Sequence, residues 1–298
     1  MRLLNFTTAV LAITLPAAAQ YQPVTLFRAP DAIESFAAFC YIGDDGTVTG
    51  HRLAAGDLAE RGYVMKKGEF ELLELVPGSD GMLITGITGK GDPIGFSFVA
   101  GQPTSRNGVI WRNGIPMVLP EPPVSQLGNS SYFFPQAANN QEAIVGYAVE
   151  RSSGGQVVAS TPMMFRNGAF TPLPPSPLDF SDFVAINDRG DILLQAPDFT
   201  QNPIRYRIFL GDRNGYQEIQ IPNAFQAIGM DSKGTIAGVT LEGDYIVYAD
   251  GAARVIPKLL GASTGLRSLN QKGQSCGIAQ TWNTLGDRLA FNFVIGLR

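Results

Sequence analysis

A short pattern recurs six times along the chain, so the chain is expected to fold as an array of similar units. Each copy begins with an apolar residue, which is followed by an Asn, an Asp or a related turn residue. Two linker residues, a glycine and alternating apolar residues complete the copy. In one copy the glycine is replaced by Glu142. The aligned positions lie 39 to 51 residues apart, at Gly46, Gly91, Glu142, Gly190, Gly234 and Gly273. This spacing is close to the roughly 40 to 50 residues of a β-propeller blade.

Each copy predicts a tight hairpin, because Asn or Asp before Gly supplies the positive φ values that join two short strands. A second hairpin turn follows at Lys67-Gly68, Asn113-Gly114, Asn167-Gly168, Asn214-Gly215 and Asp250-Gly251. Two hairpins give four strands per unit.

The ends of the units predict how the array closes. Apolar runs that follow the second hairpins stop at Pro77, Pro120, Pro174, Pro222 and Pro257. The sixth unit ends at Arg298 without a fourth strand, and residues 24–28 have the fourth-strand pattern. We therefore predict one all-β domain, a six-bladed propeller of four-stranded antiparallel blades, in which the N-terminal strand completes the last blade.

Composition agrees with a folded domain and excludes one class of partner. Hydrophobic residues make up 45% of the chain and charged residues only 16%, which is typical of a chain with a core. The net charge is −4, so no basic surplus is present for a nucleic acid backbone.

The first 19 residues have the three parts of a secretory signal. Arg2 supplies the positive charge, residues 3–15 form a short apolar stretch, and Ala17 to Ala19 form a small-residue cleavage site. We expect a mature domain over residues 20–298 that is exported to the bacterial periplasm or outside the cell. We expect it to be monomeric and not inserted in a membrane, because no later segment is apolar enough to span one.

The two hairpin motifs together resemble the extracellular HAF-repeat proteins of bacteria. The second hairpins Trp111 to Gly114 and Phe165 to Gly168 carry the resemblance, which covers nearly all of the mature chain. It implies a secreted β-propeller and gives little indication of chemistry. The family's His-Ala-Phe triplet lacks its histidine in the copies at Arg61 to Tyr63, Asn107 to Val109, Thr161 to Met163 and Asp244 to Ile246.

Cys40 and Cys276 are the only cysteines. Ring closure brings their blades together, and an exported protein can keep a disulfide, so the pair is a disulfide candidate. Two separately buried thiols are the alternative, because free cysteine packs as a small hydrophobic residue.

Candidate catalytic motifs are few. His51 is the only histidine, so every His-dependent triad or metal site would need it, and a locally hydrogen-bonded histidine is the simpler interpretation. The Gly-x-Ser-x-Gly string from Gly261 to Gly265 lies between blades without a following helix, and we interpret it as a linker. Acidic residues at 44–45 and 188–191 lack calcium-loop spacing. We expect no metal and no cofactor.

Both hairpin turns of a unit lie on one face of a propeller, which we call the turn face. The opposite loop face carries the connections from second to third strand and from blade to blade, and long connections are expected there, as at 97–108 and 150–162. Arginine with aromatic side chains is typical of interaction surfaces. The candidate binding residues are Arg52, Arg61, Arg106, Tyr132, Arg151, Arg205, Trp282 and Arg288.

The leading functional hypothesis is a binding or scaffolding module that engages a protein or a glycan through the loop face and the channel mouth. A first alternative is a hydrolase or lyase acting on carbohydrate or cell-envelope polymers, with Asp57 and Asp287 as paired carboxylates. A second alternative is a structural surface repeat without a specific ligand.

Overall fold

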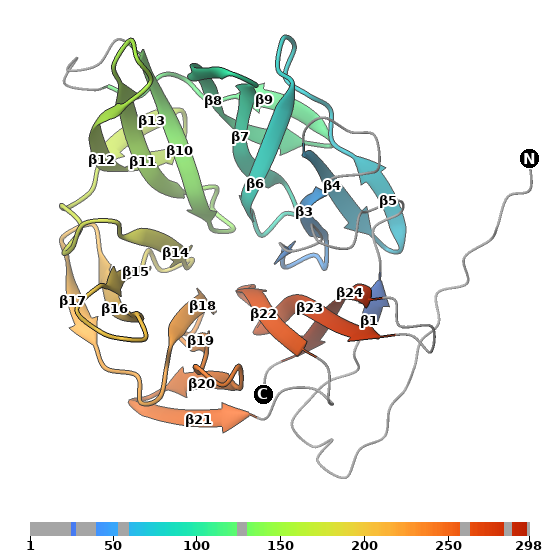
Figure 1. Cartoon of the computed structure of the whole chain (residues 1–298), viewed down its shortest axis with the longest axis vertical. Coiled ribbons are helices and arrows are strands. Elements are labelled where there is room, and N and C mark those ends of the chain that lie inside the picture. Colours follow the sequence, from blue (N-terminus) through green and yellow to red (C-terminus); the bar gives the residue numbers. More distant parts are fainter. Residues whose placement is uncertain are drawn as a thin grey trace, which may run out of the picture.

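The computed structural model describes residues 25–27, 40–52, 60–123, 130–256, 263–282 and 288–296. The described residues form six four-stranded antiparallel sheets arranged as a ring around a central axis (Figure 1). The predicted six-bladed, four-stranded β-propeller is therefore confirmed. Within the described ranges, no helix is long and apolar enough to cross a membrane.

The blades follow each other around the ring in chain order. The strands of blades 1 and 2 are β2 (Tyr41–Ile42), β3 (Val48–Arg52), β4 (Arg61–Lys66), β5 (Glu69–Leu72), β6 (Gly81–Ile87), β7 (Pro93–Val99), β8 (Gln102–Arg112) and β9 (Ile115–Val118). Those of blades 3 and 4 are β10 (Ser130–Ala138), β11 (Ile144–Arg151), β12 (Val157–Arg166), β13 (Ala169–Pro172), β14 (Asp182–Ile186), β15 (Ile192–Asp198), β16 (Arg205–Asp212) and β17 (Gly215–Ile219). Those of blade 5 are β18 (Gln226–Met230), β19 (Ile236–Val239), β20 (Tyr245–Ala249) and β21 (Ala252–Ile256).

Blade 6 contains strands from both ends of the chain. Its strands are β22 (Ser263–Leu269), β23 (Gln274–Trp282), β24 (Arg288–Gly296) and β1 (Thr25–Phe27). β1 pairs antiparallel with β24, with Leu26 opposite Phe293. The Gly-x-Ser-x-Gly string is more than a linker, because its Ser263 is the first residue of the innermost strand β22.

The first hairpin of each unit uses a different turn from the predicted one. The Oδ1 atom of Asn139 accepts hydrogen bonds from the backbone N–H of Gln141 and of Ala143, both at 3.0 Å. Asn187, Asp231 and Asn270 make the same two bonds in their own turns. Among these turn positions only the Gly, or Glu142 with φ 57°, has a positive φ. The repeated Asn or Asp therefore caps the turn through its side chain, and the predicted positive φ at that residue was wrong.

The second hairpins do have the predicted backbone conformation in four blades. Asn113 and Gly114 have φ values of 51° and 79°, and the equivalent pairs at 67–68, 167–168 and 250–251 are alike. Two successive positive φ values match the right-handed twist of the flanking strands.

Two connections on the loop face are shorter than predicted. In blade 2 only residues 100–101 separate β7 from β8, and in blade 3 only residues 152–156 separate β11 from β12. In blade 3 the β-branched residues Val149, Val157 and Thr161 lie in the extended ladder, where such residues are favoured. Arg106 consequently lies within β8, and Arg151 is the last residue of β11.

A bulge recurs in the innermost strands and explains a second glycine of the repeat. In β10 the register shifts between Pro135 and Ala137, and Gly146 of β11 lies opposite Pro135. A Cβ atom on Gly146 would lie 2.0 Å from the Phe134 carbonyl oxygen. The inner two strands thus approach more closely than a side chain at this position allows.

The core lies between neighbouring blades. One cluster joins blades 3 and 4 through residues such as Val145, Phe183 and Leu194, each at most 3% exposed. Trp111 is fully buried, and its indole N–H donates to the Glu74 carbonyl at 2.9 Å. Each blade therefore needs its neighbours to bury its apolar surface.

Candidate functional site

The central channel is one hollow of the described structure, and another, of about 500 Å³, lies on the outer part of blade 4 and is lined by residues that include Arg205. The central channel encloses about 310 Å³ and is lined by the innermost strands of all six blades. This volume is at the lower end of the range for small-ligand sites. Polar side chains on its wall include Thr85, Gln136, Asp182, Gln195, Gln226 and Arg267.

On the turn face the channel is closed by the first hairpin turns. Asn140 Nδ2 of blade 3 donates to Asp44 Oδ2 of blade 1 and to Asp188 Oδ2 of blade 4, both at 2.7 Å. Blades 1 and 3 are not neighbours, so this bond crosses the inside of the ring. Gly89 faces the same amide, because a Cβ there would lie 1.0 Å from Asn140 Oδ1.

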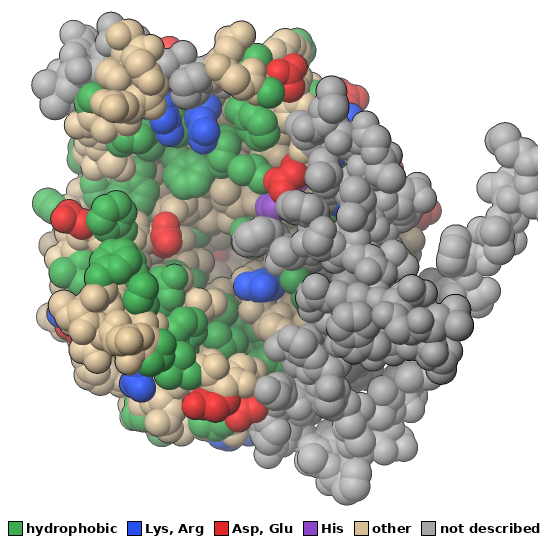
Figure 2. Space-filling model, viewed as in Figure 1, with side chains coloured by type: hydrophobic (Ala, Val, Ile, Leu, Met, Phe, Trp, Pro, Cys, Tyr) green, Lys and Arg blue, Asp and Glu red, His purple; other side chains and the backbone are tan. Residues whose placement is uncertain are grey.

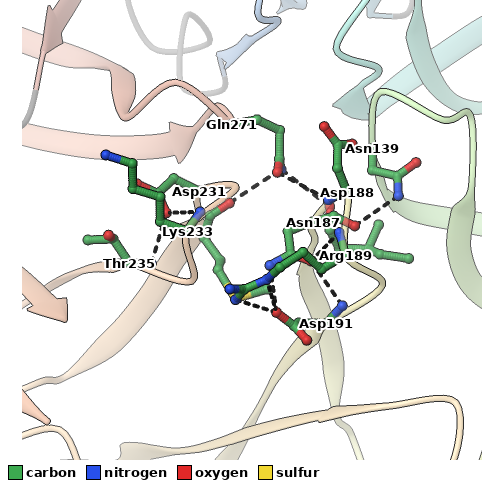
Figure 3. A network of polar contacts seen from close by, with 11 residues as sticks. Asn139, Asn187, Asp188, Arg189, Asp191, Asp231, Lys233, Thr235 and Gln271 are labelled. Carbon is green, nitrogen blue, oxygen red and sulfur yellow. Dashed lines mark hydrogen bonds and ion pairs between the residues drawn. The ribbon is translucent and has the colours of Figure 1, made fainter. Parts of the chain in front are cut away.

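Gln271 of blade 6 completes the closure. Its backbone N–H donates to Asp44 Oδ1 at 2.9 Å, and its side-chain Oε1 accepts from the Asp188 N–H at 3.3 Å. Figure 3 shows the Gln271 side chain pointing from its own turn toward that of Asp188. Ser232 Oγ of blade 5 donates to the Gln271 carbonyl at 2.9 Å. We call this group, Asp44, Gly89, Asn140, Asp188, Ser232 and Gln271, the turn plug.

The wall of the channel is held by amides that join one blade to the next. Gln136 Oε1 accepts from the Phe183 N–H at 2.9 Å, and Gln136 Nε2 donates to Asp182 Oδ1 at 2.8 Å. Gln195 Oε1 accepts from the Ala227 N–H at 3.0 Å. These fixed contacts orient polar groups at the channel before any ligand arrives.

Asp182 is the carboxylate of the wall. Burial raises its pKa above the ordinary value, and the hydrogen bond from Gln136 opposes that rise. Arg267 of β22 lines the same cavity from blade 6. Figure 2, which shows one face of the ring, has few charged side chains around the centre. The channel therefore suits a polar ligand without high charge.

Two exposed phenylalanines lie beside the channel on the loop face. Phe180 is 77% exposed and Phe199 is 64% exposed, and their rings meet edge to face with centroids 6.0 Å apart. Phe180 is two residues before Asp182 in the chain, so its Cα lies within about 7 Å of the Asp182 Cα. Isolated exposed apolar residues are common, but a highly exposed aromatic pair in edge-to-face contact requires an explanation.

Hydrogen-bonded turns hold both rings. Ser181 Oγ donates to the Leu178 carbonyl, and Tyr147 OH donates to the Ser181 carbonyl, both at 2.7 Å. Asp198 Oδ1 accepts from the N–H of Thr200 at 3.0 Å. Phe180 has φ 59°, a left-handed conformation that is unfavourable for a bulky residue.

We expect Phe180→Gly to raise the free energy of unfolding by about 0.5 to 1 kcal/mol, because glycine adopts a positive φ without strain. Phe199→Gly is the matched control, since Phe199 does not have a positive φ and loses a side chain of similar exposure. Denaturant unfolding measures both. A Phe180→Gly protein less stable than Phe199→Gly would contradict strain at this position.

The arginines predicted from the sequence are distributed over several blades. Arg52 and Arg61 lie opposite each other on β3 and β4, on the side of blade 1 that faces blade 6. Arg106 stacks over Phe96 at 5.3 Å, and Arg151 stacks over Tyr132 at 5.8 Å. Each of these two contacts lies within a single blade, and Arg52, Arg106 and Arg151 belong to blades 1, 2 and 3.

The other predicted residues are either exposed or outside the described part of the chain. Arg205 is exposed at the start of β16. Asp57 and Asp287 lie outside the described residues, as do residues 1–19, and the side chains of Trp282 and Arg288 are also outside them. The carboxylate pair of the hydrolase alternative therefore stays a prediction.

His51 is buried at the end of β3. Its Nε2 lies 3.6 Å from Glu60 Oε2, yet burial lowers the His51 pKa to about 4 and raises that of Glu60. For His51, desolvation outweighs the hydrogen bond with the Ile84 backbone, which favours the charged form, and the imidazole is neutral at pH 7.

Cys40 and Cys276 lie together at the seam between blades 1 and 6. Both are fully buried and belong to one small cluster with Ile42 and Val48. The Cys40 thiol donates to the Gly277 carbonyl at 3.6 Å, and Cys276 Sγ is 3.3 Å from Ser268 Oγ. Burial, followed by the neighbouring Cys40 sulfur, raises the Cys276 pKa well above its ordinary value. Both cysteines are free thiols in this structure.

No family model and no curated protein matches the chain, so the resemblance to HAF-repeat proteins stays a prediction. A protein of unknown function from Dyadobacter fermentans is 10% identical, with 92% of this chain and 98% of that chain covered and a TM-score of 0.48. The Cps50 (Swd1) β-propeller domain of Myceliophteria thermophila is 10% identical, with the same coverage and a TM-score of 0.41.

TolB from Acinetobacter baumannii is 10% identical, with a TM-score of 0.44. The alignment covers 86% of this chain and 53% of that chain. This chain therefore spans about half the length of the TolB chain.

The sequence contains a signal for the channel wall that its turns alone do not show. Residues three or five positions before the turn Asn, or its equivalent, line the channel: Thr85, Gln136, Asp182, Gln226 and Arg267. The two-residue period of a strand places both positions on one face. No comparable signal marks Phe180 and Phe199, because a phenylalanine in a sequence is first expected in the core.

Proposed function

We propose that this protein is a binding module whose ligand enters the central channel from the loop face. The observation that carries the proposal is a polar channel with one end closed by the turn plug. A closed floor and a wall of oriented amides make a pocket rather than a pore. Phe180 and Phe199 extend that pocket at its rim.

The proposed module is exported, with residues 1–19 removed as a signal. It is related to the extracellular HAF-repeat proteins through the hairpin motifs. Arg106 and Arg151 stack over the rings of Phe96 and Tyr132. The Arg151 guanidinium also donates to the Gly155 carbonyl and to Tyr132 OH.

Filling the channel tests the proposal. Gln226→Trp and the milder Val184→Phe place larger side chains on the wall, and Gln217→Trp on the exposed outer strand β17 is the control. The probes are cellohexaose, chitohexaose, maltohexaose and a proline-rich decapeptide, each added to residues 20–298 in a thermal-unfolding assay. We expect a probe to raise the Tm of the wild-type and Gln217→Trp proteins and to leave both filled variants unshifted.

A Tm without probe that is close to the wild-type Tm shows that a filled variant is folded. Equal probe-induced shifts in the wild-type and filled proteins would overturn the channel as the binding site. The absence of any shift with all four probes would also count against it.

A further inference from the structure

The rim and wall of the channel combine exposed aromatic rings with polar side chains. Phe180 and Phe199 present flat apolar faces to solvent. Asp182, two residues away from Phe180, presents a carboxylate that is oriented by Gln136. Gln226 of the neighbouring blade 5 and Arg267 of blade 6 add an amide and a guanidinium to the wall.

These groups match the two sides of a sugar ring. The C–H face of a pyranose packs on an aromatic ring, and its hydroxyls, which both donate and accept, pair with carboxylate, amide and guanidinium groups. An extended peptide would instead pair with an exposed strand edge or with an apolar groove. The innermost strand of each blade pairs on one side only, so its other edge borders the channel, and the aromatic pair at the rim is what favours a sugar over such a peptide.

The support of the two rings strengthens the case for a ligand. Their turns are fixed by the Tyr147, Ser181 and Asp198 hydrogen bonds, and Phe180 has a strained φ. Strain that is retained at an exposed aromatic residue is typical of a functional position. A turn whose backbone is already fixed loses little conformational entropy when a ligand binds beside it.

We propose that the mouth of the channel binds the end of a neutral glycan, with one sugar stacked on the Phe180 and Phe199 pair and the next inside, hydrogen-bonded to Asp182 and Gln226. The inference rests on the proposed function, because it names the ligand class of the same channel. Neutral sugars fit best, since the wall has one carboxylate and one guanidinium among the described residues above the turn plug.

Calorimetric titration of residues 20–298 with cellohexaose, chitohexaose and maltohexaose tests this proposal. We expect at least one hexasaccharide to bind, and both Phe180→Ala and Phe199→Ala to weaken its binding tenfold or more. Ile115→Ala and Met117→Ala are matched controls, because they remove exposed apolar side chains from the outer strand β9. These controls should bind like the wild type.

Three results would overturn the glycan assignment: no binding of any hexasaccharide at millimolar concentration, unchanged binding by both phenylalanine variants, or equal losses in the β9 controls. These three results concern the ligand class and do not by themselves contradict the channel as the binding site. If the decapeptide binds and Gln226→Trp abolishes that binding, the channel remains the binding site and only the ligand class is wrong.

A second inference stands on the seam between blades 1 and 6. Cys40 and Cys276 share one buried cluster, and the Cys40 thiol contacts the carbonyl of Gly277, the residue after Cys276. We infer that an exported form of the chain joins them as a disulfide. The two thiols lose two protons and two electrons to form the S–S bond, and a small-molecule disulfide such as oxidised glutathione accepts them as two thiols.

Refolding residues 20–298 with oxidised glutathione tests the bond. We expect the number of reactive thiols, measured in denaturant, to fall from two per chain to none, and a joined peptide containing both cysteines to appear after proteolysis. Reduction should then lower the Tm of the wild type and leave that of Cys40→Ser unchanged. Two reactive thiols after refolding, or glutathione attached to each cysteine instead, would overturn the inference.

Discussion

Asn140→Asp lowers the free energy of unfolding by about 2 kcal/mol at pH 7. The wild-type amide donates to Asp44 and to Asp188 at 2.7 Å each. The variant removes both donors without changing the size of the side chain, and it places a third carboxylate against two others. Denaturant unfolding at pH 7 measures the loss.

The pH dependence of the variant separates charge repulsion from a packing defect. At low pH the introduced carboxyl group takes a proton and becomes a donor, so the difference in the free energy of unfolding from the wild type should shrink. Gln156→Glu, which adds one carboxylate at an exposed site, is the control and should cost little. A loss that is the same at pH 7 and at low pH would mean that the turn plug does not depend on the amide.

Acidification from pH 7 to pH 4 destabilises the wild type by about 2 to 3 kcal/mol more than it does His51→Gln. Burial lowers the His51 pKa to about 4, whereas the unfolded chain titrates near 6.5. Between these values the unfolded state binds more protons, so the stability that His51 contributes is present above pH 6.5 and is lost as the pH falls toward 4. Unfolding curves of the two proteins across this range measure the difference.

Glu60 acts in the opposite direction and is common to both proteins. Its pKa is raised by burial, so its protonation favours the folded state as the pH falls. Comparing wild type with His51→Gln cancels this contribution. Parallel stability curves for the two proteins would mean that His51 is not buried as a neutral imidazole.

Much of the architecture follows from local chemistry. The repeat period, the Asn-Gly turns and the strand-ending prolines are determined by neighbours in sequence, and the six four-stranded blades follow from them. The details of the first hairpins were harder to predict, because Asn139 and its equivalents can satisfy a turn either through backbone conformation or through side-chain capping.

The candidate site depends on contacts across the ring, which no local pattern encodes. Asn140 meets Asp44 only because six turns converge on one axis, although 96 residues separate them in the chain. The arginines were chosen for their residue type, but Arg52, Arg106 and Arg151 belong to three different blades. Phe180 is exposed because Tyr147 and Ser181 fix the loop before it, which is a tertiary effect.

The turn plug also decides which part of a polymer this protein can engage. With one end of the channel shut, a chain cannot thread through the ring, so only a terminus can enter. The amount of protein that a polysaccharide can bind would then depend on its number of chain ends. Cutting the polysaccharide into shorter pieces creates more ends that can be bound, whereas lengthening each molecule creates none. Such a protein would report on the breakage of a polymer rather than on its amount.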